Sequence, residues 1–297
     1  MSTRASPFDL TNESAYLQWR SEKLGFYSPL AEHAVCIQDP ERPSAEEVRQ
    51  IVRHCERTNW VIYYCPQIGD DPEKIRALAA ALGLRHMDQN LCADQSSISA
   101  IQVREDSGRH AGYIPYTNKP LSWHTDGYYN VETRKINAIL MHCVAGAAEG
   151  GHNCLLDPEI VYLLLRDLNP EWVSALMAPD AMTIPENRDG DVLRLAVTGP
   201  VFSVGPGGYL HMRYTARTRS VEWKKEACLQ AAVAALGDIL AAQTPYHFNY
   251  APSAGYGIIS NNCLHNRSAF QDDPKLGKMR LIYRARYYER VGYLGPL

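Results

Sequence analysis

The chain has 297 residues and a formal net charge of −3; 45% of its residues are hydrophobic and 21% are charged. This composition is typical of a globular protein with a sizeable core, and it excludes collagen-like, coiled-coil and disordered chains. Because 30 basic residues are balanced by 33 acidic ones, charge gives no reason to expect a nucleic acid or a membrane surface as a partner. Composition does not choose between an enzyme and a binding module.

Cysteines and apolar runs bear on where the protein resides. The eight cysteines are spread along the chain without a CxxC pair, which indicates reduced, mostly buried thiols. The N-terminal segment lacks the apolar core of a signal peptide, and no run approaches the ~20 apolar residues of a membrane span. We therefore expect a cytoplasmic protein with no membrane partner, and the sequence is compatible with a homo-oligomer.

The N-terminal portion, about residues 1–95, has α/β patterns after a first stretch of 40 residues without a clear period. A capping box at 44–47, followed by apolar residues at helical spacing, predicts a helix. The β-branched and aromatic run 60–65 predicts a buried strand. Asp-Pro at 71–72 predicts the start of a second helix.

The remaining part, about 96–290, alternates many short strands with a few helices. Strand patterns at 98–104 and 135–144 precede two short helices within about 157–178, each opened by an Asp-Pro or Asn-Pro start. Short β-like pieces follow, then one alanine-rich helix over about 221–242, and strands return toward the end. This pattern favours a β-sandwich or barrel with helical additions.

The segment LSWHTDG at 121–127 holds the first candidate metal ligands. His124 and Asp126 are two residues apart, so on an extended chain both side chains leave the same face. An imidazole beside a carboxylate can coordinate a divalent metal, although most such pairs in proteins do not. A third ligand must come from a distant segment. His265, which follows a strand pattern, is the best candidate, and a structural histidine is the competing interpretation.

The strand pattern at 279–286 adds a concentration of positive charge. Arg280, Arg284 and Arg286 share one parity of the strand, together with Ile282. Buried arginines must meet anions, and a guanidinium is suited to a bidentate grip on a carboxylate. A solvated edge strand is the alternative. Two histidines and one carboxylate form the facial triad of non-haem Fe(II) oxygenases, which leaves positions open for a 2-oxo acid and dioxygen.

On these segments the chain resembles the Fe(II)- and 2-oxoglutarate-dependent dioxygenases of the taurine dioxygenase (TauD/TfdA) type, over roughly residues 30–290. The similarity is carried in order by SWHTDGYY, by GGHNCLLD, by GYGIISNNCLHNRSAFQDD and by MRLIYRA. It implies one dioxygenase domain over 1–297. The implied fold is mainly β with added helices, a double-stranded β-helix (jelly-roll, cupin-like) core flanked by α-helices.

The resemblance also implies a cofactor, Fe(II), a co-substrate, 2-oxoglutarate, and the oxidant O2. The implied iron ligands are His124, Asp126 and His265. Arg280 is expected to hold the distal carboxylate of 2-oxoglutarate. Asn153 stands where the family often has a co-substrate-binding threonine, and an amide can still donate a hydrogen bond there. HNR replaces the more usual HGR, and Asn266 tolerates turn geometry.

Two polar segments are candidates for contact with the substrate. Residues 113–120 precede the HxD segment and can form a lid. Residues 211–219 contain three arginines, for which salt bridges to surface acids are an equally good explanation. The candidate substrate-binding residues are Tyr116, Asn118, Arg213, Arg217 and Arg284. We expect a small, anionic or amino-acid-like substrate, and a carrier-bound one stays open.

The expected reaction is oxidation of a C–H bond, hydroxylation by default, with release of succinate and CO2. Two alternatives remain. A Zn(II)-dependent hydrolase can use the same two histidines and one aspartate, but it does not explain Arg280 or the Gly-Gly segment. A non-catalytic β-barrel binding protein is the second alternative, and the presence of all three candidate ligands argues against it.

Overall fold

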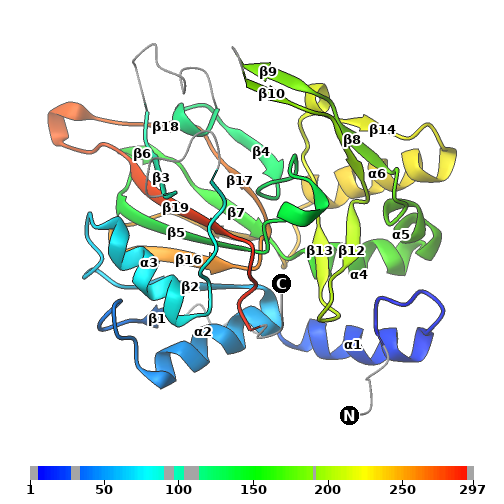
Figure 1. The fold of residues 1–297 in the computed structure, drawn as a ribbon, viewed down its shortest axis with the longest axis horizontal. Helices are drawn as coiled ribbons and strands as arrows, with labels where there is room; N and C mark the ends of the chain where they lie inside the picture. The colour runs from blue at the N-terminus through cyan, green and yellow to red at the C-terminus, as the bar shows by residue number, and fades with distance from the viewer. Residues whose placement is uncertain (1–5, 28–33, 90–96, 104–113, 190–191, 293–297) are drawn as a thin grey trace. The chain divides into compact units, whose positions relative to one another are not determined.

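The computed structural model describes residues 6–27, 34–89, 97–103, 114–189 and 192–292, which fall into two compact units (Figure 1). The first unit comprises Met1–Leu30, Trp123–Lys135 and Leu156–His247. The second comprises Ala31–Ser122, Ile136–Leu155 and Phe248–Leu297. The expectation of one dioxygenase domain over the whole chain stays a prediction.

The second unit is built on a six-stranded sheet with the order β1-β2-β16-β5-β19-β3. The strands are β1 (Val35–Cys36), β2 (Trp60–Tyr64), β3 (Ser99–Ile101), β5 (Ala138–Ala145), β16 (Tyr256–Ser260) and β19 (Leu281–Tyr287). The β1–β2 pair is parallel and the other neighbours are antiparallel. Strand β2 of the N-terminal portion thus pairs directly with β16, which comes from the C-terminal part of the chain.

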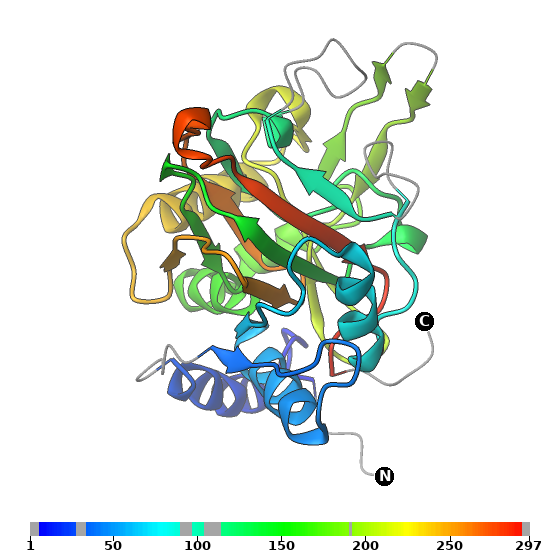
Figure 2. The ribbon, with the colours of Figure 1, turned by 90° about the vertical axis from the view of Figure 1, so that its left-hand side faces the viewer.

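Helices α2 (Ala45–Thr58) and α3 (Pro72–Ala81) cover one face of this sheet (Figures 1 and 2). Both begin where the sequence predicts. Ser44 and Glu47 form the capping box of α2, and the Asp71 side chain accepts from the Glu73 N–H at the start of α3. The fully buried core between helices and sheet includes Ile51, Cys55, Ile75, Leu78, Tyr63 and Leu140.

A four-stranded sheet with the order β15-β7-β17-β4 carries several candidate site residues. Its strands are β4 (Leu121–His124), β7 (Asn153–Leu156), β15 (Phe248–Tyr250) and β17 (Leu264–Arg267). Beside it, β6 (Glu149–Gly150) pairs with β18 (Phe270–Gln271). Gly150 has a φ of +73°, and a Cβ there would lie 2.3 Å from the Ala269 carbonyl oxygen. The first glycine of the Gly-Gly segment is therefore required by the backbone.

The first unit contains most of the helices and several short strands. The helices are α1 (Glu13–Gly25), α4 (Pro158–Leu168), α5 (Pro170–Leu176) and α6 (Ala227–Ala241). A three-stranded sheet has the order β11-β8-β14, with β8 (Met182–Ile184), β11 (Val197–Gly199) and β14 (Glu222–Trp223). Two hairpins are β9 (Asn187–Asp189) with β10 (Val192–Arg194) and β12 (Phe202–Val204) with β13 (Leu210–Met212). No helix in the described part of the chain has the length and apolar character to cross a membrane.

Two helices differ from the sequence prediction. Helix α1 was not expected, because its exposed face is polar and the side chains that it buries are Tyr16 and Lys23. It is started by Asn12, whose side chain accepts from the Ala15 N–H. Helix α6 begins at Ala227 rather than near 221, because the preceding residues form β14 and pair with β8.

Lys23 of α1 makes a buried ion pair that we expect to be important for stability. Its Nζ lies 2.6 Å from Asp157 Oδ2 and 2.5 Å from Glu159 Oε2. Burial lowers the pKa of Lys23, but the two carboxylates outweigh burial and raise it. Lys23→Met would remove the ammonium group that pairs with both buried carboxylates, so we expect the free energy of unfolding in urea to fall by about 3–5 kcal/mol.

The control for Lys23→Met is Arg49→Met, which removes an exposed ion pair with Glu46 on α2. This change should alter the free energy of unfolding by less than about 1 kcal/mol. Equal, small losses in the two variants would show that the buried pair is not a major source of stability.

Candidate metal centre

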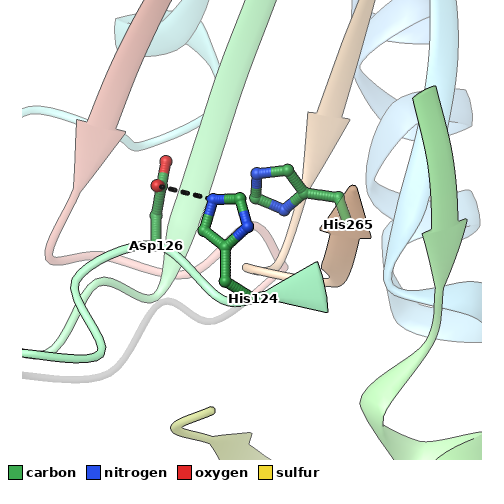
Figure 3. Close-up of side chains that lie close together, drawn as sticks. All are labelled: His124, Asp126 and His265. Atoms are coloured by element: carbon green, nitrogen blue, oxygen red, sulfur yellow. Dashed lines mark ion pairs between the residues drawn. The ribbon is translucent and has the colours of Figure 1, made fainter. Parts of the chain in front are cut away.

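The side chains of His124, Asp126 and His265 lie close together (Figure 3). One ligand atom of each residue lies within 4.8 Å of the other two, and all three residues are buried. The Nε2 atom of His124 is 3.8 Å from Oδ1 of Asp126. Two imidazole nitrogens and one carboxylate oxygen are the donor set of a facial non-haem iron site. The residues present therefore fit a ferrous ion.

Local hydrogen bonds fix the backbone and one imidazole of this group. Thr125, between the first two candidates, donates its N–H to the Tyr214 carbonyl at 3.0 Å and accepts the Tyr214 N–H on its hydroxyl at 3.1 Å. Nδ1 of His265 lies 3.0 Å from the Cys263 carbonyl oxygen. Because a carbonyl only accepts, Nδ1 carries the proton, and Nε2 is the nitrogen suited to coordination.

Arg280 is a buried cation in the second unit, 5% exposed. Among the described residues its guanidinium has no ion-pair partner, and its Nη1 is buried without a hydrogen bond. The guanidinium carbon lies 5.1 Å from the centre of the Phe270 ring. Burial lowers the pKa of Arg280, opposed by Tyr250, Cys143 and Asp272. A buried guanidinium without a carboxylate is costly, so this group fits an anionic co-substrate.

Asn153 and Tyr250 lie opposite each other on β7 and β15. The Asn153 amide donates to the Tyr250 hydroxyl at 3.2 Å. Burial raises the pKa of Tyr250, while Asn153 and Arg280 act against this rise. Asn153, the predicted co-substrate residue, thus belongs to the polar surroundings of Arg280. No local sequence pattern marks Tyr250, since only the strand register places it opposite Asn153.

The arginine of the HNR segment, Arg267, has a structural role. Its Nη1 donates to the Pro115 carbonyl at 3.1 Å, and its Nη2 to the Thr117 and Lys119 carbonyls at 2.8 and 2.6 Å. Burial lowers its pKa to about 10, helped by Arg280. The Arg267 guanidinium therefore holds the backbone of the expected lid segment in place. Position 113 of that segment lies outside the described residues.

The two lid residues predicted to meet substrate differ in exposure. Tyr116, in the 3-10 turn η1 (Ile114–Tyr116), is buried, whereas the Asn118 side chain is exposed. The Asn118 carbonyl accepts the Phe270 N–H at 3.1 Å. Their contact with substrate stays a prediction.

Arg213 was expected to bind a substrate anion, and its hydrogen bonds give it another role. Its five N–H groups donate to backbone carbonyls at 2.5–3.4 Å, those of Tyr128, Met182, Val197, Gly199 and Pro200. Burial lowers the pKa of Arg213 to about 10. Since no N–H group is left over, we leave Arg213 out of the proposed substrate site. Arg217 is exposed and hydrogen-bonds Tyr128.

The three arginines at 280, 284 and 286, in and just before β19, do not form one face. A register shift between Leu281 and Ile282 separates Arg280 from the alternation of the later residues. Arg284 is buried opposite Met141. Arg286 forms a buried ion pair with Asp88. Arg280 and Arg284 remain candidates for anion binding, and Arg286 is structural.

A pocket whose lining contains several polar side chains borders Asp126 in the first unit. It has a volume of about 430 Å³ with its open mouth included. Its lining includes Asp126, Tyr128, Lys135, Ser203 and His211. No local sequence pattern marks Lys135, whereas His211 opens the polar segment 211–219 for which contact with the substrate is predicted.

The β-rich fold, with two histidines and one aspartate grouped together, is typical of non-haem iron oxygenases. Similarity to known proteins identifies the family. The model of the family described as "Taurine catabolism dioxygenase TauD, TfdA family" matches residues 28–285. The chain belongs to this family. It is an Fe(II)- and 2-oxoglutarate-dependent dioxygenase that uses O2, as the sequence resemblance implied, and the zinc hydrolase and binding-protein alternatives are set aside.

Two relatives carry the name uridine-5'-phosphate dioxygenase. The protein from Amycolatopsis sp is 26% identical over 279 residues, which cover 89% of this chain and 95% of the relative. The protein from Streptomyces sp is 28% identical over 197 residues, 65% of this chain and 69% of the relative.

Solved structures with the same fold are more distant in sequence. The non-heme iron oxygenase OrfP in complex with Fe, succinate and (3R,4R)-dihydroxy-L-Arg has a TM-score of 0.62 at 14% identity, covering 86% of this chain and 83% of that one. An asparagine oxygenase in complex with Fe(II), 2S,3S-3-hydroxyasparagine and succinate has a TM-score of 0.59 at 12% identity, covering 97% and 86%. The predicted fold, mainly β with a cupin-like core and added helices, is confirmed.

Proposed function

We propose that this dioxygenase hydroxylates a C–H bond of a small phosphorylated molecule, and that a nucleoside 5'-monophosphate is its substrate class. The observation that carries the proposal is the likeness to a uridine-5'-phosphate dioxygenase along 95% of that relative's length. The structures that hold hydroxylated amino acids are 12–14% identical and support the fold alone. A phosphorylated substrate therefore takes precedence over an amino-acid-like one.

In this proposal His124, Asp126 and His265 hold the iron, and Arg280 pairs with the distal carboxylate of 2-oxoglutarate. When bound, iron and 2-oxoglutarate supply the oxidising chemistry: one atom of O2 enters the substrate, and the other leaves in succinate, formed together with CO2. The chain positions the reactants and limits access of water, because the three metal-binding side chains are buried. Asn153 and Tyr250 add neutral polar contacts near Arg280.

Succinate formation tests the substrate class. Enzyme with Fe(II), 2-oxoglutarate and O2 is given uridine-5'-phosphate, uridine, L-arginine, L-asparagine or taurine. We expect uridine-5'-phosphate to raise succinate formation well above the background without substrate, because it carries the group that the relatives' names specify. Mass spectrometry of the consumed nucleotide identifies the oxidised carbon. Turnover of an amino acid or taurine, with none of the nucleotide, would overturn the assignment.

A further inference from the structure

The pocket beside Asp126 has walls that are fixed by the fold. Tyr128, Val197, Gly199 and Pro200 line it, and the carbonyl of each accepts a hydrogen bond from Arg213. One buried guanidinium thus braces two separate segments of the first unit. A pocket braced in this way exists before a ligand arrives, which lowers the entropic cost of binding.

Lys135 provides this pocket with an ammonium group. Its side chain is 19% exposed, and its Nζ donates to the Ser203 hydroxyl at 2.9 Å. Because the N–H groups of Arg213 all point to carbonyls, Lys135 is better placed than Arg213 to meet an anion. Lysine binds phosphate as a compact point charge with three donors.

Glu132 is the present ionic partner of Lys135, and it is easily replaced. It precedes Lys135 by three residues, in the 3-10 turn η2 (Glu132–Arg134), and its side chain is 72% exposed. An exposed ion pair of this kind contributes little to stability. A phosphate dianion that enters the pocket can take the place of Glu132 with little loss.

We propose that this pocket is the phosphate subsite of the enzyme, in which Lys135 binds the phosphate monoester of the substrate, with the Ser203 hydroxyl and the His211 imidazole beside it. The inference rests on the proposed nucleotide substrate and adds the residues that recognise its charged group. Asp126 lines the same pocket, so a phosphate held there lies in the compartment of the proposed metal site. Glu132 competes with the phosphate for Lys135 and weakens its binding.

The test is the affinity of the anaerobic enzyme, loaded with Fe(II) and 2-oxoglutarate, for uridine-5'-phosphate and for uridine, measured by calorimetry. Lys135→Gln should weaken uridine-5'-phosphate binding about tenfold or more and leave uridine binding unchanged, because it removes one charge-assisted contact. Glu132→Gln should strengthen nucleotide binding several-fold. Lys135→Arg should keep most of the affinity, and Lys225→Gln, at an exposed position outside the pocket, should change nothing.

The outcomes separate the subsite from the proposed substrate. If Lys135→Gln leaves the preference for uridine-5'-phosphate over uridine unaltered, the phosphate subsite is refuted. If the wild-type enzyme does not bind the nucleotide, the proposed function fails. Inorganic phosphate is then the probe, and its binding is measured by the broadening of its phosphorus NMR resonance. Broadening that disappears in Lys135→Gln would support the subsite, and broadening that persists would refute it.

Discussion

His265→Ala should eliminate succinate formation and the binding of one Fe(II) per chain under anaerobic conditions. Its imidazole is the proposed ligand that lies far from the other two in sequence, and its Nδ1 is fixed on the Cys263 carbonyl. Loss of a partner in the outer shell of a metal site already costs roughly 10–100-fold in affinity or activity, so loss of a ligand should cost more. Iron analysis after desalting and the visible absorption of the complex with 2-oxoglutarate measure the effect.

The matched control for His265→Ala is His152→Ala. His152 is exposed and precedes β7 of the same sheet. The His152→Ala variant should still bind iron and turn over substrate. The ligand assignment would be wrong if His265→Ala and His152→Ala bound iron equally well.

Arg280→Met should raise the KM for 2-oxoglutarate about 100-fold or more, because a charge-assisted, bidentate contact to a carboxylate is lost in a buried place. The same change should not destabilise the enzyme without co-substrate. In the described residues no carboxylate pairs with this guanidinium, so its removal relieves a burial cost. Steady-state kinetics and the melting temperature, each with and without 2-oxoglutarate, measure both effects.

Arg267→Met is the informative comparison for Arg280→Met. Arg267 is equally buried, but its guanidinium donates to four backbone carbonyls, so its loss should lower the melting temperature. In addition, 2-oxoglutarate should stabilise the wild type and fail to stabilise Arg280→Met. A co-substrate KM close to wild type in Arg280→Met would assign the carboxylate to another residue.

Features encoded within a few neighbouring residues could be predicted from the sequence. The capping box at Ser44, the strand at 60–64 and the pair formed by His124 and Asp126 are of this kind, since a cap or a two-residue spacing needs no distant partner. His265 could be found because the resemblance to the family supplied the order of the motifs. The family, enzyme class and cofactors followed from the same order and are confirmed.

Roles set by distant contacts could not be predicted. Arg213 carries the charge that anion binding requires, but carbonyls from three other segments occupy its donors. Lys135 is an unremarkable lysine in the sequence, and only the fold places it in a pocket with Ser203 and Asp126. Helix α1 lacked a periodic apolar stripe, because one of the two side chains that it buries is the ion-paired Lys23.

The Gly150–Gly151 turn limits which substitutions this fold can tolerate during evolution. A methyl group at 150 would meet the Ala269 carbonyl oxygen at 2.3 Å, and one at 151 would lie 3.5 Å from Nε of Arg280. Both glycines have a positive φ, which larger residues rarely adopt, and a larger residue at 150 would also press on the backbone that leads from β17, the strand of His265, to β18. New substrate specificities are thus expected to arise by variation around the pocket of Lys135, while this turn keeps its two glycines and the oxidising chemistry stays the same.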